Sequence, residues 1–203
     1  TFDWAMRLLL LIGLPSSIGL FVLAGPLIAT LFGHGKFTTH DVLMSRESLM
    51  TFAVGVQGFM MVKVMASAFY AKQNIKLPVK IAAFSMVCNM VFNAILIGPL
   101  AHAGLALAAS LSGLVNAGLL LYFLLARKIY QPQKGWLRFF VKVIIANLVM
   151  LGVLLLLTPR LNLWLQPHWR WQVSHLLFSI VAALISYFVV LYIAGMRVRH
   201  FRL

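Results

Sequence analysis

Long apolar stretches alternate with short polar links along almost the whole chain. Each of six stretches is longer than about 20 residues, the length that crosses a hydrocarbon core of about 30 Å as a helix rising about 1.5 Å per residue. The stretches are Ala5–Leu31, Val42–Tyr70, Leu77–Gly98, Ala103–Ala126, Leu137–Thr158 and Val173–Met196. The pattern therefore predicts an all-α, polytopic membrane protein with six transmembrane helices.

Lysine and arginine are divided unevenly between the two sides that these crossings define. One set of alternate links and ends holds 12 basic residues, and the other set holds four, namely Lys36, Arg46, Arg160 and Arg170. Because basic residues accumulate in cytoplasmic loops, the richer side is expected to be cytoplasmic, and both ends of the chain lie on it. The segment Pro159–Trp171 is too polar to cross, and its tryptophans, among them Trp164, are expected to lie in the outer headgroup layer.

Composition narrows the class of protein further. The chain is 63% hydrophobic and carries a net charge of +14, with only three acidic residues. The basic residues stand at the ends of apolar stretches rather than in one patch, so nucleic acid is not an expected partner. Cys88 is the single cysteine, no catalytic or metal-binding cluster is evident, and Gly35-Lys36 lacks the Ser or Thr of a P-loop. We therefore expect no metal, no cofactor and no enzyme activity.

Proline and glycine interrupt two regions of the apolar pattern. Pro15 and Gly25-Pro26 fall inside the first stretch, where proline bends a helix, either for transport movements or as a static kink. The short link Pro99–His102 predicts that the third and fourth stretches form an antiparallel hairpin. Small residues on the fourth stretch, such as Gly113 and Gly118, are expected to let helices pack closely.

Lys63 lies deeper inside its apolar stretch than any other lysine or arginine of the chain, since the others stand in the links or near the ends of the stretches. It lies nine residues before Lys72, roughly 13 Å along a helix, and a lysine side chain reaches only about 6 Å by snorkelling. A charge at that depth is expensive unless it faces water or a partner. Two roles are open for Lys63: contact with an anionic substrate in a cavity, or a structural role beside water or a helix outside this chain.

Uncharged polar residues accompany Lys63 within the apolar stretches. Gln57 precedes it by six residues, and Asn89 and Asn93 stand four apart on one face of the third stretch. We predict Lys63, Gln57 and Asn93 as residues of a substrate cavity. Asn89 and Asn93 are predicted to form a polar site, which either binds a cation or, as the absence of a neighbouring carboxylate favours, joins helices by hydrogen bonds.

Several short motifs resemble one family of transporters. The chain resembles the MurJ/MviN lipid II flippases, of the multidrug/oligosaccharidyl-lipid/polysaccharide exporter superfamily, in order along its length. The motifs are LFGHGKFT (Leu31–Thr38), VKVMA around Lys63, FYAKQNIKLPVKIA (Phe69–Ala82), GPLAHAGLALA (Gly98–Ala108) and YQPQKGW (Tyr130–Trp136).

The resemblance implies a fourteen-helix protein with two lobes of six helices and two further C-terminal helices. This chain is then expected to be its C-terminal portion. Residues 1–130 would be the last four helices of the second lobe, and residues 131–203 the additional pair, with the missing N-terminal helices as partners. The cavity arginines typical of the family lie on helices one, two and eight, outside this chain.

The resemblance also implies a function in cell-wall synthesis. Members flip lipid II, the undecaprenyl-pyrophosphate-linked disaccharide-peptide precursor of peptidoglycan, across the bacterial inner membrane by alternating access. Two alternatives stay open from the residues alone. One is another exporter of the superfamily, for a polysaccharide-lipid or drugs, and the other is a non-transporting scaffold for cell-wall enzymes.

Overall fold

The chain is all-helical in a computed structural model that describes residues 2–33, 35–133, 135–159, 161–165 and 169–195. The helices are α1 (Phe2–Val22), α2 (Ala24–Phe32), α3 (Thr39–Ala71), α4 (Lys76–Ala126), α5 (Trp136–Leu157), α6 (Leu161–Trp164) and α7 (Trp169–Ile193). Five of them, α1, α3, α4, α5 and α7, are long and apolar enough to cross a membrane. The predicted fold class is confirmed. Met196 and the basic residues at 134, 160, 197, 199 and 202 lie outside the described residues.

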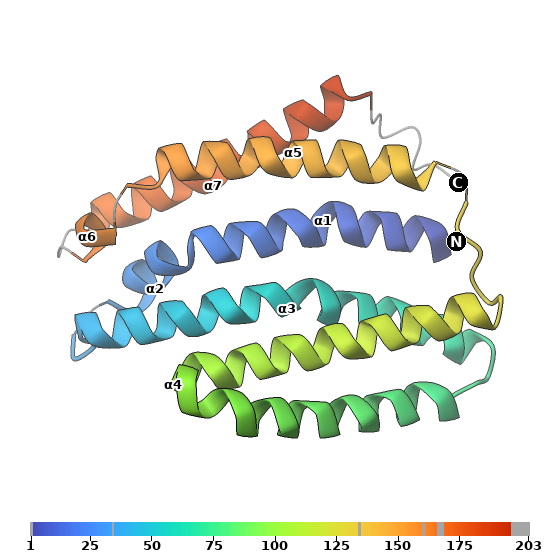
Figure 1. Cartoon of the computed structure of the whole chain (residues 1–203). Helices are drawn as coiled ribbons and strands as arrows, with labels where there is room; N and C mark the ends of the chain where they lie inside the picture. Colours follow the sequence, from blue (N-terminus) through green and yellow to red (C-terminus); the bar gives the residue numbers. More distant parts are fainter. Residues whose placement is uncertain (1, 34, 134, 160, 166–168, 196–203) are drawn as a thin grey trace. The chain divides into compact units, whose positions relative to one another are not determined.

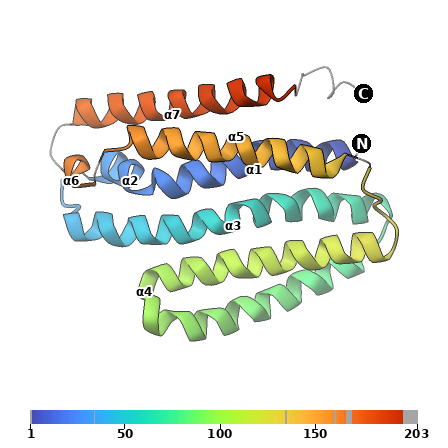
Figure 2. The same ribbon diagram turned by 45° about the horizontal axis from the view of Figure 1, so that its top comes forward.

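Helix α4 contains two of the six predicted crossings. Its 51 residues fold back on themselves at Ala101, whose φ of 45° and ψ of −121° are not helical. Figures 1 and 2 show the resulting hairpin of two antiparallel arms. A Cβ at Gly104 would collide with the backbone of Leu96, so glycine allows the arms to meet beside the turn. The predicted hairpin is confirmed, and its turn is concentrated on one residue.

The first predicted stretch is broken, although not at its first proline. Pro15 lies within α1, where the Ser16 hydroxyl donates to the Ile12 carbonyl at 2.7 Å. The break falls at Leu23, between α1 and α2, and Pro26 follows in the first turn of α2. Proline is tolerated in a first turn because the N–H that it lacks needs no partner there. Neither proline therefore stands at the residue where the helix is interrupted.

Helix α3 begins with a reciprocal cap. The Thr38 N–H and hydroxyl donate to Asp41 Oδ2 at 2.8 and 2.7 Å, and the Asp41 N–H donates to Thr38 Oγ1 at 3.3 Å. Such a cap satisfies N–H groups that have no partner within the helix, and the carboxylate also complements the helix dipole.

Removal of this cap has a measurable consequence. We expect Thr38→Ala to lower the free energy of unfolding by about 1 kcal/mol, as for other N-cap substitutions. Thr39→Ala is the matched control, because Thr39 is also exposed and its side chain makes no hydrogen bond among the described residues. Equal stability of the two variants in detergent unfolding would show that the cap contributes nothing.

The helices group into two compact units. The first comprises residues Thr1–Ser17 and Thr51–Lys134, and the second comprises Ile18–Met50 and Gly135–Leu203. The predicted division of labour, with a boundary at residue 130, concerns the longer protein and stays a prediction.

The first unit is held by close helix packing and by a polar node. A Cβ at Gly55 of α3 would lie 2.5 Å from the Ser110 Cα of α4, so the two backbones nearly touch. At the node, Asp3 of α1 pairs with Arg7 at 2.9 Å and accepts the Tyr130 hydroxyl at 2.7 Å. Asp3 is only 7% exposed. The node therefore ties the start of α1 to the segment that follows α4.

The second unit is built around α5 and α7. These helices pack along each other, and α2 contacts both α6 and α7. Leu154 and Tyr187 are among the residues buried there. Trp164 of α6 is fully buried, and its carbonyl accepts the Gln172 amide at 2.6 Å. Neighbouring helices therefore enclose the Trp164 ring, and its depth in the outer headgroup layer stays a prediction.

Candidate functional site

An open hollow of about 430 Å³ lies within the first unit, between α3 and the two arms of α4. Five of its ten lining residues are polar or charged, namely Lys63, Ser85, Asn89, Ser112 and Asn116, although most of the exposed lining surface is apolar. The other five are apolar or small, namely Phe59, Val62, Ala82, Met86 and Gly113. Three helical segments that are distant in sequence therefore bring a cation, hydroxyls and carboxamides together.

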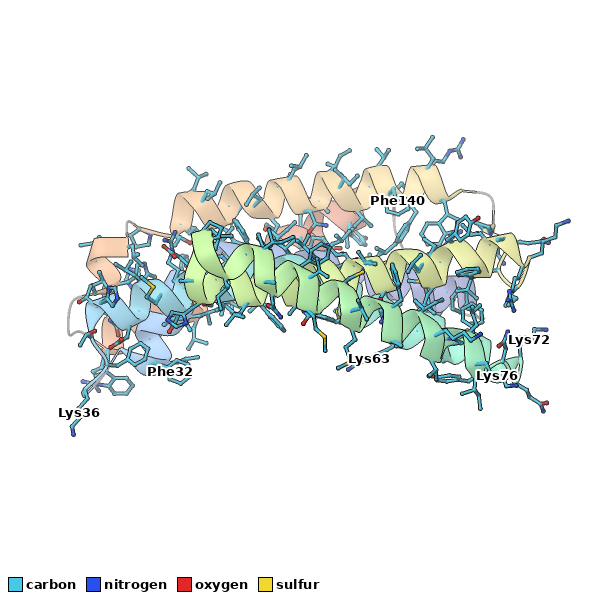
Figure 3. The ribbon with its side chains drawn as sticks, turned by 60° about the horizontal axis from the view of Figure 1, so that its bottom comes forward. Phe32, Lys36, Lys63, Lys72, Lys76 and Phe140 are labelled. Atoms are coloured by element: carbon cyan, nitrogen blue, oxygen red, sulfur yellow. The ribbon has the colours of Figure 1, made fainter. Side chains whose placement is uncertain are left out.

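Lys63 is exposed and lies part-way along the bundle, away from Lys72 and Lys76 at one end (Figure 3). Within the described residues it makes no hydrogen bond and no ion pair. The three acidic residues of the chain do not reach it. Asp3 pairs with Arg7, Asp41 caps α3, and Glu47 stands sixteen residues earlier, more than four helical turns away.

Asn89 joins the two arms of α4. Its Nδ2 donates to the Ser112 hydroxyl at 3.2 Å, and the Asn93 Nδ2 donates to Asn89 Oδ1 at 3.0 Å. Ser112 in turn donates to the Ala109 carbonyl at 2.9 Å. The arrangement is a hydrogen-bonded ladder from one arm to the other.

The hydrogen-bonded ladder predicts a small coupling free energy between the side chains of Asn89 and Ser112. We expect Asn89→Ala and Ser112→Ala each to destabilise the protein. Their coupling energy in a double-mutant cycle is expected to be about 0.6 kcal/mol, the average for hydrogen bonds between membrane helices. Unfolding of the two single variants and the double variant measures it. Strictly additive effects would contradict a direct bond between these side chains.

The predicted site residues are only partly brought together. Lys63 and Asn89 line the hollow, and Asn93 adjoins it through Asn89. Gln57 is half-buried, outside the lining, and its amide oxygen faces Gly13 of α1 so closely that a Cβ there would collide with it. The roles of these residues stay predictions.

Ser85 is a lining residue that the sequence analysis did not single out. It is 5% exposed, and its hydroxyl has no hydrogen-bond partner among the described residues. It precedes Asn89 by four residues, so helical spacing was a usable signal. Nothing in the sequence placed this face of α4 opposite Lys63. No group of three or more potential metal-ligating side chains occurs in the part of the chain that the structure describes.

Apolar helices long enough to cross a bilayer, with a cation in a hollow among them, define a polytopic α-helical membrane protein. The family model described as "Lipid II flippase MurJ" matches residues 1–175, and the chain belongs to this family.

Two relatives and one solved structure illustrate the similarity. A Haemophilus influenzae protein named probable lipid II flippase MurJ is 38% identical over 200 residues, which are 98% of this chain and 39% of the relative. A Burkholderia cenocepacia lipid II flippase MurJ is 43% identical over 152 residues, or 75% of this chain and 30% of the relative. The structure titled "Lipid II flippase MurJ, inward closed conformation" shares the fold, with a TM-score of 0.76 at 24% identity, over 97% of this chain and 39% of that one.

Proposed function

We propose that this chain is part of a transporter that flips lipid II across the bacterial inner membrane during peptidoglycan synthesis. Membership of the flippase family over residues 1–175 carries the proposal. The relatives that bear the flippase name are longer than this chain, which spans 39% of the Haemophilus influenzae protein. The activity is therefore assigned to the complete protein, to which this chain contributes part of the transport path.

We infer that the protein acts as a transporter rather than an enzyme, by alternating access to the two sides of the membrane. The proposed orientation puts both ends of this chain in the cytoplasm. Its support is the 12-to-4 division of basic residues between alternate links. The substrate would be the undecaprenyl-pyrophosphate-linked disaccharide-peptide, and the surrounding partners would be membrane lipids and helices outside this chain.

We further propose different tasks for the two predicted regions. Residues 1–130 would complete a transport lobe that contains the hollow. Residues 131–203 would guide the polyprenyl tail. Exposed aliphatic side chains along α5 and α7 support the second task, among them Leu148, Leu155 and Ile185, which are 61%, 61% and 58% exposed. Such surfaces suit a hydrocarbon chain because they offer it no polar group.

Growth of a bacterium depleted of its own flippase tests the proposed function. We expect the gene that encodes this chain, expressed with whatever sequence accompanies it in its own genome, to restore growth, because it supplies translocation. The empty vector is the control. Normal insertion of the protein into the membrane without growth would favour another exporter of the superfamily or a scaffold.

A further inference from the structure

The Lys63 ammonium group has no negative partner among the described residues of this chain. It lies within the apolar stretch Val42–Tyr70, where an unpaired charge is unfavourable. All three acidic residues of the chain are described, and none reaches it: Asp3 and Asp41 have the partners given above, and Glu47 is more than four turns away. A carboxylate for Lys63 must therefore come from elsewhere.

The hollow around Lys63 has the surface of a helix-packing site. It is open to its surroundings and has a volume of about 430 Å³. Phe59, Val62 and Met86 provide apolar walls, and Gly113 lies against the Phe59 ring so closely that a Cβ there would collide with it. Apolar walls beside small residues are typical of contacts between transmembrane helices.

Two polar atoms beside Lys63 also lack partners. The Ser85 hydroxyl and the Asn116 Oδ1 are buried without a hydrogen bond among the described residues. Both residues line the hollow. Buried polar groups are almost always hydrogen-bonded in complete structures, and membrane ion pairs need such neighbours to satisfy their remaining lone pairs and protons. A carboxylate in the hollow would accept from Lys63 and Ser85 together.

We propose that a transmembrane helix outside this chain packs into the hollow and presents one Asp or Glu carboxylate to Lys63. The relatives contain ample sequence for such a helix, since this chain covers 39% of the Haemophilus influenzae protein. Charge complementarity supports it, because the chain itself carries 17 basic and three acidic residues. Lys63 is then a positioning residue that anchors this chain to the rest of the protein, and it does not bind substrate.

Substitution of Lys63 tests the first half of this proposal. We expect Lys63→Met, at the chromosomal gene, to reduce the amount of folded protein several-fold and to lower its thermal midpoint, because a lone carboxylate would stay buried. Lys63→Arg keeps the charge and should restore most of the folded protein. Lys72→Met is the matched control, since Lys72 is exposed at the end of α3. Size-exclusion profiles in detergent measure all three without reference to transport.

Second substitutions that restore folding of the Lys63→Met variant identify the carboxylate that pairs with Lys63. Each Asp and Glu in the transmembrane helices outside this chain is neutralised, to Asn or Gln, in the Lys63→Met background. We expect one neutralisation to restore folded protein, because it removes the unpaired charge. The proposal is overturned if none restores it. It is also overturned if Lys63→Met folds normally, whether lipid II binding then falls, which would indicate a substrate contact, or stays unchanged, which would indicate a hydrated side chain. These readouts leave the proposed flippase activity as a separate question.

Discussion

Gly55→Ala is expected to destabilise the protein by about 1–3 kcal/mol or more, although alanine is the better helix former. The added Cβ would lie 2.5 Å from the Ser110 Cα and 2.6 Å from its Cβ. Ser110 is fully buried, and its hydroxyl donates to the Thr51 carbonyl at 2.7 Å. Backbone atoms cannot move aside as a flexible side chain can, so α3 and the second arm of α4 must separate and this bond weakens.

Gly118→Ala is the matched control on α4, because a Cβ at Gly118 meets nothing within 4 Å. At Gly118 the higher helix propensity of alanine, worth up to about 1 kcal/mol, is the only effect of the substitution. We therefore expect a slightly raised thermal midpoint. Thermal unfolding of both variants in the same detergent measures the difference. If Gly55→Ala were as stable as Gly118→Ala, the close contact between the two helices would not exist in the protein.

The second large effect is expected at Asp3. Asp3→Ala should destabilise the protein by about 3–5 kcal/mol, because it removes the carboxylate that pairs with the Arg7 guanidinium in a largely enclosed site. The Asp3 and Arg7 side chains are only 9% and 24% exposed, and the Nε–Oδ2 distance is 2.9 Å. Tyr130 loses its acceptor as well, and its ring packs against Phe2 with centroids 4.9 Å apart.

Two further variants separate charge from packing at this node. Tyr130→Phe removes only the hydroxyl and should lower stability by about 1 kcal/mol. Asp3→Ala combined with Arg7→Met removes both charges and should recover much of the loss. Unfolding in mixed micelles compares the three variants with the unsubstituted protein. A double variant no more stable than Asp3→Ala alone would mean that the ion pair is not the source of the effect.

The course of the chain through the membrane could be predicted from local features. Length and apolarity decide whether a stretch can cross, so the crossings were predicted from the residues alone. The short link at Pro99–His102 left room only for a hairpin, and the structure folds α4 back at Ala101. The separation of Lys63 from acidic residues also followed from the sequence, because the chain has only three of them and all are distant from Lys63 along the chain.

The faces of the helices could not be predicted in the same way. A helix that is apolar all round carries no amphipathic signal to show which side meets a neighbour. Gly113 and Gly118 look equivalent in sequence, yet a Cβ at Gly113 would press on the Phe59 ring and one at Gly118 would meet nothing. The contact between Asp3 and Tyr130 joins residues 127 positions apart. Only the tertiary fold brings such pairs together.

The proposed function makes this chain part of a protein that moves lipid II across the membrane. The most direct measurement is the fraction of labelled lipid II that a membrane-impermeant hydrolase can cleave on the outer face of cells whose own flippase has just been depleted. With the gene for this chain and its accompanying sequence expressed, we predict that the cleavable fraction stays at the level of undepleted cells. A fall to the empty-vector level, with the protein present in the membrane in normal amounts, would contradict the claim.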